Sequence, residues 1–446
     1  MEEELFSACF NGNVERVQEL LTNPHIVPNY QPNGLGLTTL NIACLKNHPE
    51  VVKLLLNDER ILVDVNRGGK YERTAFHTAC LSKNIEVIKL FLSNERVDVN
   101  KEDDETQTPF LTSCAHGNVE VVKLLLSDER IDVNRAECVM GATPFSFACQ
   151  SGYVEIVKLL LDDQRVDVNK ENNLSWTPFH IICGSEHLEI VKLFLNNQRV
   201  QLNGLDNKNH TPFYIACENG HNEIVELLLN DNRIDINQEN SSGSTPFLVA
   251  CFKGHFEIVK LLLNDERVDV NKANKNGVTP LWTVCQKGRV EILKLLLKDW
   301  RIDVNKEEEE FYKTPFWVGC YCRHIEVVKM LLNDKRININ QPNNNVVMFL
   351  ACSCDSGQIE MIQYLLASER ELNLNEEDWN DAIQTAKTKD YTKIIELLES
   401  FQKDPNETRF KLRKHLGILG IIKFILSFIY LFYDFFYFYF IFEIQF

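Results

Sequence analysis

The sequence predicts an all-α fold, a solenoid of stacked helix-turn-helix units with projecting loop fingers, followed by a hydrophobic C-terminal helix. Three observations predict it. A Thr-Pro-Phe or related triplet recurs about every 34 residues, a cysteine follows six residues after each triplet start, and the chain beyond residue 403 loses the repeat and becomes apolar. A fixed period of this length is typical of repeat architectures, in which each unit stacks on its neighbours.

The repeat can be followed position by position. Triplets begin at Thr38, Thr74, Thr108, Thr143, Thr177, Thr211, Thr245, Thr279 and Thr314, with a degenerate version at Val346. The matching cysteines are Cys44, Cys80, Cys114, Cys149, Cys183, Cys217, Cys251, Cys285, Cys320 and Cys352. Cys9 holds the same place in an incomplete first unit, and residues 378–399 match loosely as a last one. The array therefore has about twelve units.

Each unit is expected to hold two short helices. In "QTPFLTSCAHGNVEVVKLLLSDERIDVN", Thr108 can cap the first helix with its hydroxyl, and Pro109 follows where its missing amide costs nothing. Gly117 can end that helix in a left-handed conformation, and Asn118 is suited to cap the second helix.

The second helix is expected to be buried almost all round. Its apolar residues are Val121, Val122, Leu124, Leu125 and Leu126. Glu120 and Lys123 lie three apart on the exposed edge, where they can form a weak surface pair.

These motifs resemble the ankyrin repeat family, whose pattern is close to "G-x-TPLHxAAxxGHxxVVxLLLxxGAxxN". Here it reads "TPFxxACxxGHxEIVKLLLNDERIDVN", over roughly residues 3 to 400. The resemblance implies helix pairs in a right-handed, gently curved solenoid that binds other proteins. The expected segments are an N-terminal capping unit (1–37), ten repeats (38–375), a C-terminal capping helix pair (376–403), a basic linker (404–415) and a transmembrane tail anchor (416–442).

The sequence departs from the family pattern at two positions. The family histidine survives only at His77 and His180, so the hydrogen-bond network that it makes is open in the other units. The inter-helix glycine is replaced by Lys83, Glu186 and Arg323. A left-handed conformation at these residues costs about 1 kcal/mol or more, which predicts local softness.

Fourteen cysteines raise the question of metal binding. Eleven fall at the repeated position, where a small buried thiol in a tight helix contact is the favoured interpretation. The pairs Cys320/Cys322 and Cys352/Cys354 could in principle form a four-sulfur zinc site. However, residues two apart on a helix point about 200° apart, and adjacent units lie about 10 Å apart. We therefore expect no metal and no cofactor.

Polar residues also recur at fixed positions. The arginines of the "DER" segments are Arg60, Arg96, Arg130, Arg165, Arg199, Arg233, Arg267, Arg301, Arg336 and Arg370. We expect structural pairing with neighbouring acids, such as Glu266 and Asp269 beside Arg267, rather than a grip on an anionic polymer. The asparagines that close "DVN", such as Asn100, Asn134, Asn169 and Asn271, are expected in turns.

Charge and motifs narrow the function. A net charge of −17 disfavours sequence-independent binding to nucleic acid, and the chain carries no phosphate-binding loop or hydrolase, metalloprotease or kinase signature. We expect no enzymatic activity. Acidic runs in the loop fingers, at Lys101–Gln107 and Lys306–Lys313, would steer a basic partner if they are functional, and otherwise are solvated loops.

In a repeating frame, binding residues should lie where the units differ. In ankyrin repeats these are mainly the residue before the triplet and the two residues after the small pair. The candidate partner-binding residues are Trp176, His210, Phe252, Lys253, Gln286, Lys287 and Tyr321. Exposed aromatics are common anchors of protein recognition. The alternative is that Trp176, Phe252 and Tyr321 only pack on the neighbouring finger.

The C-terminal segment breaks the pattern. Arg409–His415 is basic and Leu416–Phe442 is almost entirely apolar, long enough to span a bilayer. The candidate membrane residues are Lys423, which can snorkel, Phe424, which opens the most apolar stretch, and Asp434, which opposes insertion. The alternatives are an artefact of an A/T-rich gene model and an amphipathic or buried helix.

Together these features predict a non-enzymatic, monomeric scaffold or adaptor that binds a protein partner. Because the N-terminus shows no signal peptide, we expect a cytoplasmic protein, either free or tail-anchored on the cytosolic face of a membrane. Two alternatives stay open. One is an elastic structural membrane tether, and the other is a substrate-recruiting subunit of an enzyme complex.

Overall fold

The computed structural model of the chain describes residues 1–32, 36–62, 65–310, 312–340, 350, 353–354 and 357–418. These residues form helices and no strand, as the sequence predicts. They divide into two compact parts of several repeats each, Met1–Ser241 and Ser242–Phe446, which we call the first and the second unit. Most of Leu416–Phe442, including Lys423, Phe424 and Asp434, lies outside the described residues, as do Val346 and Cys352.

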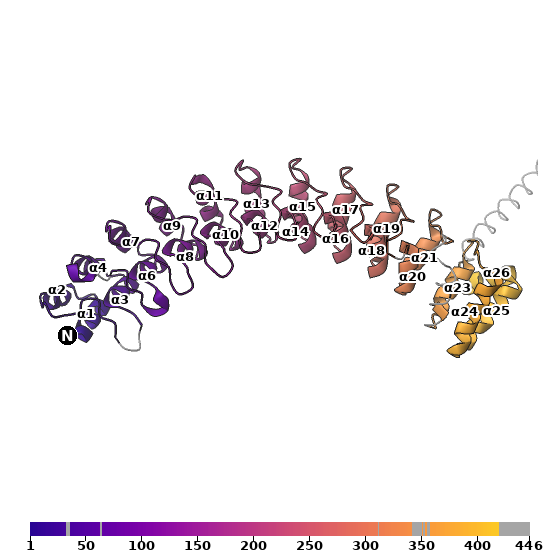
Figure 1. Cartoon of the computed structure of the whole chain (residues 1–446), viewed down its shortest axis with the longest axis horizontal. Coiled ribbons are helices and arrows are strands. Elements are labelled where there is room, and N and C mark those ends of the chain that lie inside the picture. Colours follow the sequence, from indigo (N-terminus) through magenta and orange to yellow (C-terminus); the bar gives the residue numbers. More distant parts are fainter. Residues whose placement is uncertain are drawn as a thin grey trace, which may run out of the picture. The chain divides into compact units, whose positions relative to one another are not determined.

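The first unit consists of helix pairs. Its helices are α1 (Glu2–Asn11), α2 (Val14–Leu21), α3 (Thr39–Leu45), α4 (Pro49–Leu56), α5 (Glu59–Leu62), η1 (Lys70–Glu72), α6 (Ala75–Leu81), α7 (Ile85–Leu92), α8 (Pro109–Ala115), α9 (Val119–Leu126), α10 (Pro144–Gln150), α11 (Val154–Asp162), α12 (Pro178–Cys183), α13 (Leu188–Leu195), α14 (Pro212–Asn219) and α15 (Asn222–Leu229). First helices of successive pairs pack on one another, and so do second helices (Figure 1).

The second unit repeats the same plan. Its helices are α16 (Pro246–Lys253), α17 (Phe256–Leu263), α18 (Pro280–Lys287), α19 (Val290–Lys298), α20 (Pro315–Tyr321), α21 (Ile325–Asn333), α23 (Ile359–Ala367), α24 (Glu376–Thr388), α25 (Thr392–Lys403) and α26 (Pro405–His415). The segment expected as a basic linker is α26, which packs against α23 and α25 (Figure 1). Asp404 caps it, and Leu412 is buried.

The start of each first helix follows the predicted chemistry. The Thr108 hydroxyl accepts a hydrogen bond from the backbone N–H of Leu111, and Pro109 is the first residue of α8. Phe110 and Cys114 of that helix are fully buried. The apolar residues of α9, with Val121 and Leu125 buried, close the core from the other side. A wall of large and small apolar side chains therefore recurs in each unit.

The inter-helix turn takes two forms. Gly117 has a φ of 70°, and Lys83 and Arg323 adopt the same left-handed region at 59° and 65° although they are not glycine. Glu186 does not, which corrects the expectation for this residue. Helix α12 ends at Cys183, and its turn is closed by a hydrogen bond from the Ser185 N–H to the Ile182 carbonyl. This unit thereby avoids the strain that a left-handed side chain carries.

Candidate functional site

The repeated arginines join each repeat to the one before it. The Arg130 guanidinium forms an ion pair with Asp128 at 2.7 Å, and its other edge donates to the carbonyl oxygen of Leu92, the last residue of α7. The hydrogen bond from Arg130 lowers the pKa of Asp128 below its usual value. The helix-end carbonyls are partial negative charges, so a guanidinium there satisfies an orphan acceptor and the helix dipole together.

The same arrangement recurs along both units, with the acid always two residues before the arginine. The arginines that donate in this way to the last residue of the preceding second helix are Arg60 (to Leu21), Arg165 (to Leu126), Arg233 (to Leu195) and Arg301 (to Leu263), while Arg336 donates to Leu297, the last residue but one of α19. The partner acid differs from the one expected from sequence. Arg267 pairs with Asp265 at 2.6 Å, an acid other than the Glu266 and Asp269 named from the sequence.

The asparagines of "DVN" also join each repeat to the next one. The side-chain amide of Asn100 donates to the Arg130 carbonyl at 2.7 Å, and its oxygen accepts from the Asp132 N–H at 2.8 Å. Asn66, Asn134, Asn169, Asn203, Asn271, Asn305 and Asn340 make the same pair of bonds to the following unit. A side chain that pairs with backbone in both directions fixes the spacing of the units, a role beyond the turn expected from the sequence.

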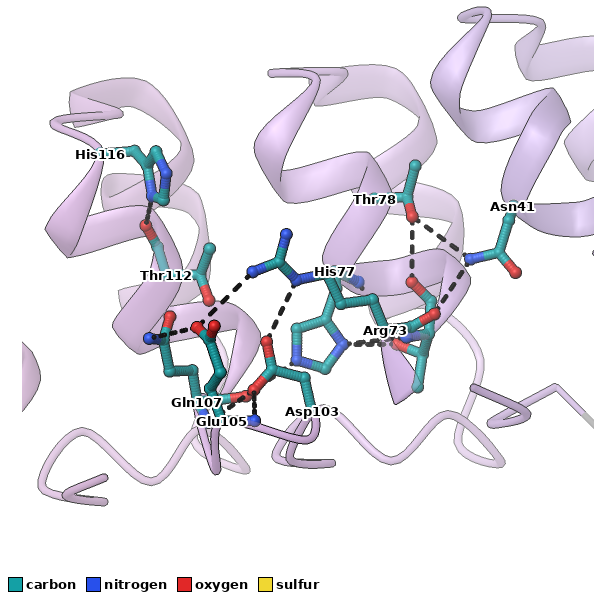
Figure 2. Close-up of polar contacts among 10 residues, drawn as sticks. Asn41, Arg73, His77, Thr78, Asp103, Glu105, Gln107, Thr112 and His116 are labelled. Carbon is teal, nitrogen blue, oxygen red and sulfur yellow. Dashed lines mark hydrogen bonds and ion pairs between the residues drawn. The ribbon is translucent and has the colours of Figure 1, made fainter. Parts of the chain in front are cut away.

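The histidine at the third residue after the capping threonine, as in His77, makes a third contact between neighbouring repeats, which is drawn in Figure 2. His77 is fully buried; its Nδ1 lies 2.9 Å from the Thr74 hydroxyl, and its Nε2 bonds the Gln107 carbonyl at 3.0 Å. Burial lowers its pKa below the usual value. Beside it, the Arg73 guanidinium donates to buried Asp103 at 3.1 Å. The ring therefore acts as a neutral bridge between two units.

Other side chains replace the histidine without losing this contact. Asn41 completes the capping box with Thr38 and donates to the Arg73 carbonyl at 3.2 Å. Trp282 donates its indole N–H to the Lys313 carbonyl at 3.1 Å. In both cases the acceptor is the residue before the next triplet, as it is for His77. In these two repeats the contact that the sequence left open is made by different chemistry, whereas Leu111 and Leu248 at the same position have no side-chain donor.

Asn118 corrects another expectation. It precedes α9, but its side chain makes no cap there and instead donates to the Cys80 carbonyl at 3.3 Å. Asn84 does the same to Cys44 at 2.7 Å, because both amides are buried against the preceding unit. The histidines at this position reach similarly, as His187 does to the Gln150 carbonyl.

The repeated cysteines lie in the helix contacts. All those of the described residues are buried, from Cys9 to Cys320. Burial raises the pKa of Cys9 and of Cys80 to about 12, so these thiols stay protonated at neutral pH. Cys322 is half-buried. In the parts of the chain that the structure describes, no three His, Cys, Asp or Glu side chains come together as metal ligands would.

The side chains of the candidate residues Trp176 and His210, in the first unit, form hydrogen bonds within the repeat array. The Trp176 indole N–H donates to the Asp206 carboxylate at 3.1 Å, and His210 Nδ1 lies 3.0 Å from the same carboxylate. His210 also stacks on Tyr214 with ring centroids 4.5 Å apart. Both side chains are only partly exposed, so packing on the neighbouring finger, the alternative interpretation, describes Trp176.

The candidates of the second unit are arranged differently. Phe252, in the last turn of α16, has 41% of its surface exposed, and the Lys287 ammonium of α18 lies 4.5 Å above its ring. Lys253 is exposed beside it. Gln286 is half-buried, and its carbonyl accepts from His324 at 3.0 Å, so its backbone belongs to the frame. A cation over an exposed aromatic ring is a contact that a partner can extend.

Tyr321 continues this surface on α20. It is 59% exposed and stacks on Trp317 at 4.8 Å, while the Lys313 ammonium lies 4.3 Å from the Trp317 ring. We call Phe252, Lys253, Lys287, Lys313, Trp317 and Tyr321 the aromatic-basic surface. Helices α16, α18 and α20 carry no aspartate or glutamate. The helix residues of this surface therefore carry positive charge only, on a chain of net charge −17, whereas Lys313 follows the acidic residues of its finger run.

Two aromatic residues were not among the candidates taken from the sequence: Trp317 of the aromatic-basic surface, and Trp300 of the loop after α19. Trp317 takes the triplet histidine position, where the sequence marked it only as a departure from the family pattern. Trp300 is 86% exposed where most other units have glutamate in "DER". A large apolar residue at a position that is polar in the other repeats is the signal that would have singled it out.

The acidic finger runs are partly structural. The Asp103 carboxylate accepts from the N–H groups of Glu105 and Gln107, at 3.0 and 2.9 Å. Glu308 accepts from the Glu310 N–H at 2.9 Å in the equivalent loop. These two carboxylates shape their turns, and Glu102 of the first run forms an ion pair with Arg135 of the next repeat at 2.6 Å.

No helix of the described part of the chain is long and apolar enough to cross a bilayer. The candidate anchor residues are not among those described.

Comparison with known families gives one result. The sequence model of the family described as "Ankyrin repeats (3 copies)" matches residues 5–103, 90–172, 164–240, 232–308 and 301–378. A search of curated proteins finds no match.

Proposed function

Because the chain belongs to the ankyrin repeat family, whose repeats are generally protein-interaction modules, we propose that it is a non-enzymatic adaptor that binds its partner through the aromatic-basic surface. One observation carries the proposal. Among the candidate side chains, those of the first unit are bonded within the frame, whereas Phe252 and Tyr321 present exposed rings beside lysines. Exposed aromatics with adjacent cations are typical anchors of protein recognition.

The chemistry of this surface favours an acidic partner segment. Lys253 and Lys287 lie at the ends of α16 and α18, and no carboxylate lies on either helix. A segment with acidic and apolar side chains would pair with the lysines and cover the rings of Phe252 and Tyr321. The acidic finger runs, which favour a basic partner, are a separate surface, and part of their charge is used to hold the turns.

The experiment starts with the full chain carrying a photo-crosslinking amino acid in place of Tyr321. The partner captured in cells of the source organism is identified, purified and titrated against the wild type and the double variant Phe252→Ala/Tyr321→Ala. A loss of about tenfold or more in affinity is expected, which is common for truncated aromatic anchors. Trp176→Ala is the matched control, because it removes an aromatic ring that the frame uses. Equal binding by wild type and double variant would refute the surface.

Membrane attachment remains part of the proposal. The apolar run Leu416–Phe442 and the basic helix before it favour a tail-anchored adaptor over a free one. The elastic tether predicts weak partner binding with membrane localisation retained, which the titration and fractionation of the same chain distinguish. The substrate-recruiting subunit predicts that an enzyme complex is captured with the partner.

A further inference from the structure

Two grooves of the second unit occupy the same place in the repeat. One lies between the ends of α17 and α19; it has a volume of about 640 Å³, and its charged lining residues are Lys260, Glu266, Lys298, Asp299 and Arg301. The other lies between the ends of α21 and α23 and beside α26; it measures about 560 Å³, and its charged lining residues are Lys329, Lys335, Glu369, Arg370 and Arg413. We call them the inner groove and the C-terminal groove.

The two grooves differ in charge at equivalent positions. The inner groove is lined by three cations and two carboxylates, whereas the C-terminal groove is lined by four cations and one carboxylate. Lys335 takes the place of Glu266, which reverses a charge. Ser368 takes the place of Asp299, which removes a negative charge. Two exchanges act the other way, since Ala367 takes the place of Lys298 and Glu369 that of Trp300, and Arg413 has no counterpart in the inner groove. The same frame therefore presents a more positive cavity at its C-terminal end.

The loss of the aspartate changes the repeated arginine. In the inner groove, Arg301 donates from its Nε to Asp299 at 3.1 Å and forms an ion pair with it at 2.7 Å. In the C-terminal groove, Arg370 donates to the carbonyl oxygens of Asp334 and Ile337, but its Nε is buried with no acceptor among the described residues. Its positive charge lacks the carboxylate that accompanies Arg301.

Helix α26 adds charge to the same groove. No further repeat arginine follows to cap α23, and Arg409 and Arg413 donate to the carbonyls of Leu366 and Ala367 instead, at 3.3 and 3.1 Å. Arg413 also forms an ion pair with Glu369 at 2.7 Å. The hydrogen bond from Arg413, with the charges of Lys335 and Arg409, lowers the pKa of Glu369. Glu369, the one carboxylate among the described lining residues, is thus already shared among cations.

One lysine of the lining is partly neutralised. Lys329 forms an ion pair with Glu326 at 2.7 Å, approaches Glu360 at 3.5 Å and lies 4.1 Å from the Tyr364 ring. The equivalent Lys260 also pairs with the glutamate three residues before it, at 3.6 Å. This pair is therefore common to both grooves, and the excess charge comes from Lys335, Arg370 and Arg413.

We propose that the C-terminal groove binds a phosphate group, held by Lys335, Arg370 and Arg413. Guanidinium and ammonium groups are the donors that phosphate oxygens favour, and the cavity has room for such a group. The phosphate belongs either to a soluble molecule or to the head group of an acidic lipid. Lys414 of α26 is exposed and lies in the sequence directly before the apolar C-terminal run, which favours the lipid.

The inner groove supplies the variant that tests this site. Ser368→Asp restores the carboxylate found beside Arg301, so it should retain or raise the unfolding temperature while it neutralises Arg370. The full chain in neutral detergent is titrated with inorganic phosphate by calorimetry. The substitution is expected to weaken binding by about tenfold at low salt. Glu266→Lys/Asp299→Ser gives the inner groove counterparts of Lys335 and Ser368 but none of Arg413, so it is expected to bind phosphate more weakly than the C-terminal groove does.

The source of the phosphate is tested with vesicles. Wild type and Ser368→Asp are mixed with phosphatidylcholine vesicles, with and without phosphatidic acid. Any contribution of the apolar tail is the same in both proteins. A preference for phosphatidic acid that Ser368→Asp abolishes supports the lipid head group, and phosphate binding without that preference supports a soluble ligand. Equal phosphate affinity of the two proteins, a lipid preference that survives Ser368→Asp, or no binding of either probe would overturn the proposal.

Discussion

The guanidinium of Arg130 donates a 2.7 Å hydrogen bond to the carbonyl oxygen of Leu92, the last residue of the second helix in the preceding unit. This contact explains why a charged residue recurs in a chain without a catalytic motif. It joins two units, neutralises a helix end and leaves the ion pair with Asp128 intact. A polar residue that recurs in every repeat of this chain therefore indicates a contact that holds neighbouring repeats together.

Arg130→Ala is expected to lower the free energy of unfolding by about 1–2 kcal/mol, because the Leu92 carbonyl loses its donor and Asp128 loses its partner. Amide hydrogen exchange should increase at the end of α7. Lys123→Ala is the matched control, since its exposed pair with Glu120 contributes about 0.5 kcal/mol or less. Urea unfolding and hydrogen exchange measure both variants. Equal effects of the two substitutions would contradict the role given to Arg130.

His77→Asn is expected to change stability by less than about 1 kcal/mol at pH 8, because Asn41 makes the same inter-unit bond at the equivalent position. The pH dependence should change more. Burial lowers the His77 pKa, so its contribution to stability is complete above the unfolded pKa near 6.5 and is lost as pH falls through the folded pKa. The variant should lose less stability than wild type between pH 7 and pH 5, as judged by urea unfolding. An unchanged pH profile would argue against a buried neutral ring.

The buried thiols predict a loss of stability in alkali. The pKa of Cys9 and of Cys80 is raised to about 12 by burial, above the usual 9.0. A raised folded pKa means that this contribution is complete below pH 9 and is lost as pH rises from 9 toward 12. The unfolding temperature should fall over that range, and Cys80→Ser should reduce the fall. Iodoacetamide should label exposed Cys138 in the native protein and leave Cys9 and Cys80 unmodified until unfolding.

A membrane anchor predicts carbonate-resistant membrane association of the full chain. Removal of residues 419–446 should release it to the soluble fraction while α26 stays in place, because that helix ends at His415. The truncated protein should keep the unfolding temperature of the full chain. Fractionation with carbonate measures the first effect and thermal unfolding the second. A full-length chain that stays in the soluble fraction would count against the anchor.

Periodic features of the fold could be predicted from the sequence because they depend on local chemistry. The capping threonine Thr108, Pro109 and the left-handed Gly117 follow from backbone preferences of single residues. The inter-unit partners could not be predicted in the same way. Asn118 fits the N-cap of α9 equally well by sequence, and only the position of the Cys80 carbonyl decides where its amide donates.

The candidate surface was predicted in part. Sequence variation selected Trp176 and Phe252 together, because both are aromatics at variable positions. They differ in their neighbours. Asp206 lies within hydrogen-bond distance of the Trp176 indole, whereas Phe252 faces the Lys287 ammonium and remains 41% exposed. The distinction depends on residues about 30 positions away in the sequence, which no single repeat reveals.

The most direct test compares a frame variant with a surface variant in the same unit. Partner affinity and unfolding free energy are measured for Arg301→Ala and for Phe252→Ala/Tyr321→Ala in the full chain. Arg301→Ala should lower the unfolding free energy and keep the affinity, since its guanidinium bonds Asp299 and the Leu263 carbonyl. The double variant should keep the stability and lose about tenfold in affinity. A frame variant that loses affinity at unchanged stability, or a surface variant that binds normally, would contradict the division between frame and binding surface.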